Sequence, residues 1–120
     1  MSLYEKYGGF SKINKLVMAF YDTLLDSEEI GPYFDDTDMA RLIDHQTKFV
    51  AMLMGGPASY SDEQIRRAHA PLSVTGVHFD EMKRILGVTL RDHGVEAADS
   101  AQVLQEVESR RGLIVRDETA

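Results

Sequence analysis

The sequence contains no cysteine among its 120 residues. This absence excludes disulfide bonds, thiolate zinc sites and cysteine nucleophiles together. Any metal chemistry must therefore use histidine, aspartate, glutamate, tyrosine or methionine side chains. The chain has four histidines, and these are the first residues to examine for such a role: His45, His69, His78 and His93.

Long hydrophobic runs are also missing, and no apolar stretch approaches the roughly 20 residues needed to span a bilayer. The N-terminal residues Met1–Lys6 lack the basic and then apolar pattern of a signal peptide. Basic residues are few, because 13 lysines and arginines face 20 acidic residues, for a formal net charge of -7. Such a charge repels phosphate backbones and anionic lipids, so we expect a cytoplasmic protein without nucleic-acid or membrane partners.

The remaining composition is that of one folded domain. The hydrophobic fraction of 43% is somewhat below the globular average, but no low-complexity tract or block of like charges interrupts the chain. A chain of 120 residues is long enough for a single core and too short for two.

Amphipathic helices are predicted in the first half of the chain. Apolar residues at i, i+3, i+4 and i+7 predict a long helix with Ser11 as its N-cap and an end near Asp26–Ser27. A second long helix is predicted after Thr37–Asp38. It should stop at Met54, because Gly55–Pro57 follows.

Three further helices are predicted in the second half. Ser61–Gln64 has the capping-box pattern that opens a short helix ending around Pro71. Thr75 should cap a helix that ends at His93–Gly94, and a last helix should begin beyond Ala97. The apolar face of this last helix would consist of Val103, Leu104, Val107 and Ile114. No strand-like alternation of useful length appears, so the predicted fold class is all-α.

Two polar residues lie where these helices should be apolar. Gln46 lies near the middle of the apolar stripe of the second long helix, and Tyr21 lies on the flank of the stripe of the first. A buried amide without a partner costs on the order of 1–3 kcal/mol, so Gln46 requires a protein, water or ligand partner. Periodicity alone favours a structural hydrogen bond for Gln46 and a core-filling role for Tyr21.

The four histidines differ in their predicted surroundings. His69 lies one turn after Ile65 in the short helix, so its imidazole should face the interior, where an isolated histidine is more often a core residue than a ligand. His45 borders an apolar stripe and is interpreted as partly exposed. His78 near a helix start and His93 before a terminal glycine are interpreted as structural.

Motifs of other functional classes fail on spacing. The chain has no H-E-x-x-H, P-loop, G-x-G-x-x-G or G-x-S-x-G sequence. Asp35–Asp38 lacks the glycine and the closing glutamate of a calcium loop. His45–Lys48 has the H-x-x-K spacing of phosphotransfer histidines, although Phe49 stands where that motif usually has glycine. A helical phosphotransfer or protein-interaction module is therefore one alternative.

The order and spacing of several fragments resemble the group I truncated haemoglobins, which are small globins with a two-over-two helical sandwich. The fragments cover nearly the whole chain: Leu3–Gly9, Phe20–Tyr21, Tyr33–Phe34, Asp38–Leu42, His45–Gln46, Gly55–Pro57, Ala68–His69 and Thr75–Phe79. The resemblance implies a truncated globin domain over residues 1–115. Residues 116–120 are polar and are predicted to form a frayed tail.

The resemblance also implies a haem b cofactor, iron protoporphyrin IX, and assigns roles by position. His69 matches the proximal histidine that coordinates the iron. Tyr21 and Gln46 match the distal pair that hydrogen-bonds a gaseous ligand, and Phe34 matches the aromatic residue that packs against the porphyrin. The implied cofactor-binding residues are Phe34, Leu42, His45, Phe49, His69 and Phe79.

Three details refine this assignment. Leu42 takes the place where many globins carry a distal histidine, so ligand stabilisation would depend on Tyr21 and Gln46. No histidine follows His93, so the covalent haem link of some cyanobacterial members has no candidate and the haem should be held noncovalently. Positive side chains that could reach the haem propionates are Arg41, Lys48 and Arg66, each of which is also an ordinary solvated residue.

His45 matches a histidine that occupies the sixth iron position in some cyanobacterial members when no external ligand is present. It is the evident nitrogen donor on the distal side, because Leu42 cannot bind a metal. We therefore expect His45 as a second iron ligand in the unliganded protein. The alternative is that Tyr21 or water takes that position while His45 stays in solvent.

The resemblance implies that the protein binds dioxygen, carbon monoxide and nitric oxide reversibly. Its implied role is oxygen binding or oxygen transport. Oxidation of nitric oxide to nitrate is an activity known in the family, and it would need a reductase partner. The phosphotransfer alternative instead requires a haem-free protein that exposes His45 to a kinase.

Overall fold

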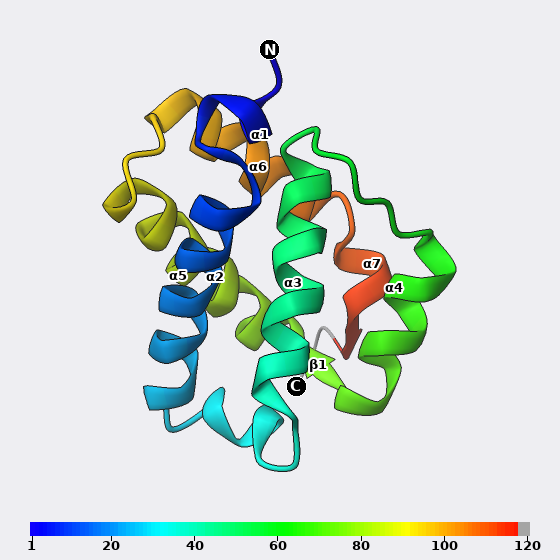
Figure 1. The fold of residues 1–120 in the computed structure, drawn as a ribbon. Coiled ribbons are helices and arrows are strands. Elements are labelled where there is room, and N and C mark those ends of the chain that lie inside the picture. Colours follow the sequence, from blue (N-terminus) through cyan, green and yellow to red (C-terminus); the bar gives the residue numbers. More distant parts are fainter. Residues whose placement is uncertain (118–120) are drawn as a thin grey trace.

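The computed structural model describes residues 1–117, and these residues form a bundle of helices with one small sheet (Figure 1). The elements follow in the order α1 (Leu3–Lys6), α2 (Gly9–Asp26), the 3-10 helix η1 (Gly31–Phe34), α3 (Met39–Leu53), α4 (Asp62–His69), the 3-10 helix η2 (Ala70–Leu72), β1 (Val74–Thr75), α5 (Gly76–Asp92), α6 (Ala97–Glu108), α7 (Arg111–Ile114) and β2 (Val115–Asp117). The predicted all-α class is confirmed.

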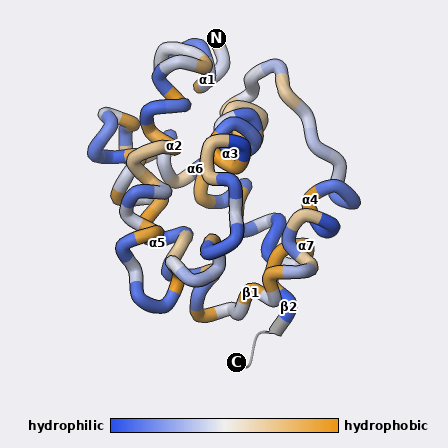
Figure 2. Tube along the Cα trace, turned by 60° about the horizontal axis from the view of Figure 1, so that its bottom comes forward, coloured by the Kyte–Doolittle hydropathy of each residue, from blue (hydrophilic) through white to orange (hydrophobic). Residues whose placement is uncertain are grey.

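Four long helices make the two layers of the molecule. Helices α2 and α3 pack against each other, α5 packs against α6, and further contacts join α2 to α5 and α3 to α6. Figure 2 shows polar and apolar residues alternating along these helices, as expected when one face of each helix is buried. The fully buried side chains at the centre include Ile13, Leu24, Leu90 and Val103. In the part of the chain that the structure describes, no helix is long and apolar enough to cross a membrane.

The helix ends follow local side-chain chemistry. Asp38 accepts a hydrogen bond from the Arg41 amide at the start of α3, and Thr75 does the same for the His78 amide at the start of α5. Ser61 and Gln64 form the complete capping box of α4. These predicted starts are confirmed, as is the end of α2 at Asp26.

The predicted N-cap at Ser11 is wrong. Helix α2 begins at Gly9, three residues earlier than a Ser11 cap predicts, and its N-cap is Gly8 in a left-handed conformation with φ 96°. Glycine adopts this conformation without the steric cost of a Cβ atom, and a Cβ at position 8 would collide with the Lys12 side chain. The helix thus starts at a backbone turn without a side-chain cap, so capping preferences in the sequence do not indicate its first residue.

The C-terminal region departs further from the prediction. The last predicted helix is divided, so that Ile114 belongs to α7 and not to α6. The Ser109 hydroxyl and the Arg110 guanidinium both donate to the Glu106 carbonyl, at 2.8 and 2.7 Å. Side chains thereby satisfy a carbonyl near the end of α6 that a continuing helix would use.

The segment after α7 is a strand. Residues of β2 pair in parallel with β1, with Val74 opposite Val115 and Thr75 opposite Asp117. Strand β2 thus includes Arg116 and Asp117, the first two residues of the predicted tail, and the expected absence of strands was wrong for these two short segments. Residues 118–120 of that tail lie outside the described residues.

Candidate functional site

A cavity lies between the two helical layers and the α4–β1 segment. Most of its walls are aliphatic or aromatic. Each of α2, α3, α4, α5, α6 and α7 contributes at least one side chain to the lining.

His69 projects into this cavity from the last residue of α4. Its Nδ1 lies 2.8 Å from the Ile65 carbonyl oxygen, so the Nδ1–H donates to the backbone and the lone pair remains on Nε2. Burial lowers the pKa of His69, with the carbonyl contact acting in the opposite direction. A neutral imidazole with a fixed tautomer and a free Nε2 is the state required of a metal ligand.

Tyr21 enters the cavity from α2. Its ring is 6% exposed and makes edge-to-face contacts with Phe20 and Phe34, at centroid distances of 5.1 and 5.5 Å. Burial raises the pKa of the Tyr21 hydroxyl, so this group remains a protonated donor. Within residues 1–117 the hydroxyl has no hydrogen-bond partner, although a buried tyrosine hydroxyl usually has one.

Gln46 enters the cavity from α3 and is half-buried. No side chain or backbone group of the described chain bonds to its amide, so the structural hydrogen bond favoured by periodicity is not found there. The neighbouring Thr47 is fully buried, donates to the Ile43 carbonyl at 2.7 Å, and accepts a hydrogen bond from Asn14 at 3.2 Å. The Asn14–Thr47 bond joins α2 to α3 and sets the relative placement of Tyr21 and Gln46.

The other predicted cofactor contacts divide into two groups. Phe34, Leu42, Phe49 and Phe79 all line the cavity. His45 does not. Its side chain is exposed, while its backbone carbonyl accepts a hydrogen bond from Tyr60 at 3.3 Å.

The structure also places the positive side chains considered for the propionates. Lys48 pairs with Asp44 at 3.0 Å and Arg66 pairs with Glu63 at 3.1 Å, both on the surface, and Arg41 is exposed. None of the three lines the cavity. Lys83, which sequence reasoning missed, does line it, and its ammonium pairs with Glu108 at 2.6 Å. Lys83 lies at the polar edge of α5, so the apolar periodicity of that helix does not indicate that it lines the cavity.

The two histidines interpreted as structural do not line the cavity, although Tyr33, which contacts His78, does line it. His78 Nδ1 lies 2.7 Å from the Tyr33 hydroxyl, and its Nε2 lies 3.6 Å from a Glu29 carboxylate oxygen. His93 Nδ1 lies 3.0 Å from the Thr89 carbonyl oxygen.

These residues restrict the kind of group that the cavity can hold. Over the described residues no three His, Cys, Asp or Glu side chains gather as a metal site. A metal bound by His69 would therefore have to bring most of its other ligands with it, as a porphyrin does. Mostly apolar walls, one neutral imidazole, and the polar groups of Tyr21 and Gln46, which no other described residue hydrogen-bonds, together fit a haem and a small polar ligand.

Comparison with known proteins agrees with this site. Residues 2–115 match the family model of bacterial-like globins. The chain belongs to this globin family. A group 1 truncated hemoglobin from Tetrahymena pyriformis is 33% identical over 110 residues, covering 92% of this chain and 91% of the relative. Another from Synechocystis is 36% identical over 98 residues, covering 78% of this chain and 79% of the relative.

Solved structures show the same fold. The truncated hemoglobin of Tetrahymena pyriformis in its Fe(III) form superposes with a TM-score of 0.86 at 31% identity, covering 96% of this globin and 98% of that chain. The 2/2 hemoglobin of Synechococcus, in the cyanomet state with covalently attached heme, gives a TM-score of 0.88 at 31% identity, with coverage of 96% and 98%.

Family membership makes haem the cofactor of this globin, and the donors in its cavity fit that group. The expected group I truncated haemoglobin family and its two-over-two fold are confirmed. A haem globin binds diatomic gases, so the phosphotransfer alternative for His45 is not favoured.

Proposed function

We propose that this globin binds dioxygen, carbon monoxide and nitric oxide reversibly in the cavity, between His69 on one wall and Tyr21 and Gln46 on another. The observation that carries the proposal is the pair of polar side chains, Tyr21 and Gln46, that line a mostly apolar cavity and have no hydrogen-bond partner among residues 1–117. The iron of a bound haem supplies the coordination position for the gas and the electron for redox chemistry. His69 would hold the haem noncovalently through its free Nε2.

The side chains of Tyr21 and Gln46 would act on the gas by hydrogen bonding. Tyr21 stays protonated because burial raises its pKa, so it can donate to a ligand that has become polarised. The Gln46 amide can donate as well. The aromatic and aliphatic walls exclude water, which strengthens both hydrogen bonds.

The proposal also includes the oxidation of nitric oxide to nitrate. One nitric oxide, one dioxygen and one electron combine to give one nitrate ion. In this scheme Tyr21 and Gln46 retain dioxygen until nitric oxide arrives through the apolar cavity. The electron must then be replaced by a reductase.

The test is to mix the reduced, dioxygen-loaded protein with nitric oxide and measure the nitrate produced. The proposal predicts one nitrate for each equivalent of nitric oxide consumed, together with oxidation of the protein. Reversible carbon monoxide and dioxygen binding without nitrate formation would retain the gas-binding function and reject the oxidation. Absence of a Soret band after haem supplementation would reject both.

His45 remains a proposed second iron ligand in the unliganded protein. Its exposed side chain would have to turn from solvent into the cavity, next to Gln46 on the same helix. The alternative leaves His45 in solvent, with Tyr21 or water at that position. The two arrangements predict different spectra for a His45 variant.

A further inference from the structure

The C-terminal segment Arg111–Asp117, consisting of α7 and β2, forms a strap across one side of the haem cavity. Ile114 of this strap lines the cavity, and so does Val74 of β1, the strand with which β2 pairs. If the strap moved away, the cavity would lose part of its wall on the side that carries His69.

Apolar packing does little to hold this strap in place. Helix α7 has four residues and no buried side chain, far below the roughly 12–15 residues at which an isolated helix becomes even marginally stable. The β1–β2 pair is two short strands with an irregular register, and two-stranded pairs are marginal in water. A polar hollow open to the surface is lined by residues of α4 and by Gly112 and Leu113 of the strap.

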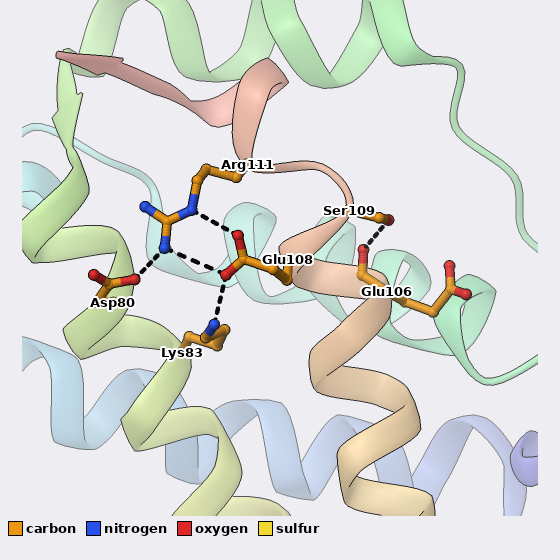
Figure 3. A network of polar contacts seen from close by, with 6 residues as sticks. All are labelled: Asp80, Lys83, Glu106, Glu108, Ser109 and Arg111. Carbon is orange, nitrogen blue, oxygen red and sulfur yellow. Dashed lines mark hydrogen bonds and ion pairs between the residues drawn. The ribbon is translucent and has the colours of Figure 1, made fainter. Parts of the chain in front are cut away.

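Among the described residues of the strap, Arg111 makes ion pairs with both α5 and α6 (Figure 3). Its guanidinium pairs with Asp80 of α5 and with Glu108 of α6, the latter at 2.7 Å from Nε. It also lies over the Phe79 ring, with Cζ 4.7 Å from the ring centroid. Glu108 continues the network to Lys83 at 2.6 Å. One side chain thus connects the strap to both helices of the second layer.

The network is directly attached to the cavity wall, because Phe79 and Lys83 both line the cavity. Hydrogen bonds from Arg111 and Lys83 lower the pKa of Glu108 to about 2, so this carboxylate stays charged throughout the physiological range. Arg116 adds a weaker link, donating to the Ala70 carbonyl at 3.3 Å. The closed position of the strap therefore depends on charged contacts more than on buried area.

We propose that Arg111 is a positioning residue that keeps the C-terminal strap closed over the haem cavity and thereby slows the loss of haem. The proposal rests on the haem cofactor established above and assigns a role to the chain between α6 and its C-terminal strand. Arg111 acts through Phe79, Lys83 and Ile114, each of which lines the cavity.

The test uses the haem-loaded protein and measures haem transfer to an excess of apomyoglobin. Replacement Arg111→Met keeps an unbranched apolar stem and removes the guanidinium with its charge, so haem dissociation should accelerate by about tenfold at low ionic strength. Arg111→Lys restores the charge without the bidentate geometry and should give an intermediate rate. The matched control is Arg84→Met on α5, which breaks an exposed pair with Glu81 outside the cavity and should leave the rate unchanged.

The salt dependence of haem loss distinguishes the loss of charged contacts at the strap from a general packing defect. Screening shortens the Debye length from about 10 Å at 0.1 M to about 3 Å at 1 M salt, so salt should accelerate haem loss from the wild type and affect Arg111→Met much less. Equal rates and equal salt dependence in the two proteins would overturn the proposal.

A second variant keeps the test decisive if Arg111→Met does not retain haem. Asp80→Asn leaves Arg111 and Glu108 in place and should give a smaller acceleration, whereas an unchanged rate would contradict the strap. Failure of the wild type itself to bind haem would overturn the gas-binding function as well. That result is visible as a missing Soret band before any transfer is measured.

Discussion

The two walls of the cavity that carry the polar groups are built in different ways. Tyr21 and Gln46 lie on α2 and α3, helices of 18 and 15 residues that pack along each other and contribute many of the buried side chains. His69 lies on α4, a helix of eight residues in which only Ile65 is buried. Its neighbours on that side are the strap and a two-residue strand.

This difference indicates that packing fixes the distal groups, whereas local hydrogen bonds fix the proximal one. Tyr21 is held by surrounding rings and Gln46 by the helix pair joined at Asn14 and Thr47. His69 is held by the Ile65 carbonyl and by the capping box that starts its helix. The distal wall should therefore resist local opening, and the proximal wall should respond to single polar substitutions.

The largest effect should come from a truncation in the distal wall. Leu24 of α2 is 1% exposed, and Leu24→Ala should lower the free energy of unfolding by about 2–5 kcal/mol, since the substitution leaves a cavity. Leu113→Ala, in the half-buried part of the strap, should cost roughly 1 kcal/mol. Urea unfolding followed by circular dichroism compares them. Equal losses would show that the two walls do not differ in packing.

Loss of the distal hydrogen bonds should have the next largest effect. Tyr21→Phe removes only a hydroxyl, and it should accelerate dioxygen dissociation by about tenfold or more, because a hydrogen bond to a charged group contributes about 1.5–3 kcal/mol. Gln46→Leu should accelerate it less. Carbon monoxide, which is less polarised, should respond weakly to both changes. Stopped-flow rates equal to wild type in both variants would show that neither side chain contacts the gas.

Removing the cap of the proximal helix should give a smaller, local effect. Ser61→Ala deletes the hydroxyl that accepts from the Gln64 amide and should destabilise α4 by about 1 kcal/mol. Hydrogen exchange of the α4 amides would report the opening. The control is Ser11→Ala, because Ser11 is exposed within α2 and caps nothing. Protection of α4 that is unchanged in Ser61→Ala would contradict local fixation of His69.

His45→Ala should change little in the fold, since the side chain is exposed. If His45 binds iron in the unliganded protein, the wild type is low-spin at neutral pH and the variant shifts toward high-spin. Ferric and ferrous absorption or resonance Raman spectra measure this difference. A high-spin wild type, or a low-spin spectrum that the substitution leaves unchanged, favours the alternative in which Tyr21 or water takes the position.

The long helices were predictable because their signals are local and repeated. Apolar periodicity and the caps Asp38, Ser61 and Thr75 defined the helices from the residues alone. The division between α6 and α7 was not predictable in this way, because side-chain bonds to the Glu106 carbonyl compete with a helix that the apolar pattern would allow to continue. The β1–β2 pair joins segments about 40 residues apart in sequence through a few backbone groups, and it leaves no periodic pattern.

The site was only partly predictable. Periodicity identified Gln46 as a polar residue in an apolar stripe, but it favoured a protein partner that the described residues do not provide. The roles of His69, Tyr21 and Phe34 came from the resemblance to truncated haemoglobins, and their common cavity agrees with those roles. Lys83 and Asn14 were missed because their importance depends on contacts between helices.

The most direct test of the site is the visible absorption spectrum of His69→Gly, recorded with and without imidazole in the reduced and carbon monoxide-bound states. The wild type should show the Soret band of a globin. The variant should lose the normal reduced and carbon monoxide-bound spectra. Added imidazole should restore them, because the glycine leaves space for free imidazole where the His69 ring was. Reduced and carbon monoxide-bound spectra identical to wild type without imidazole would contradict the assignment of His69 as the proximal ligand.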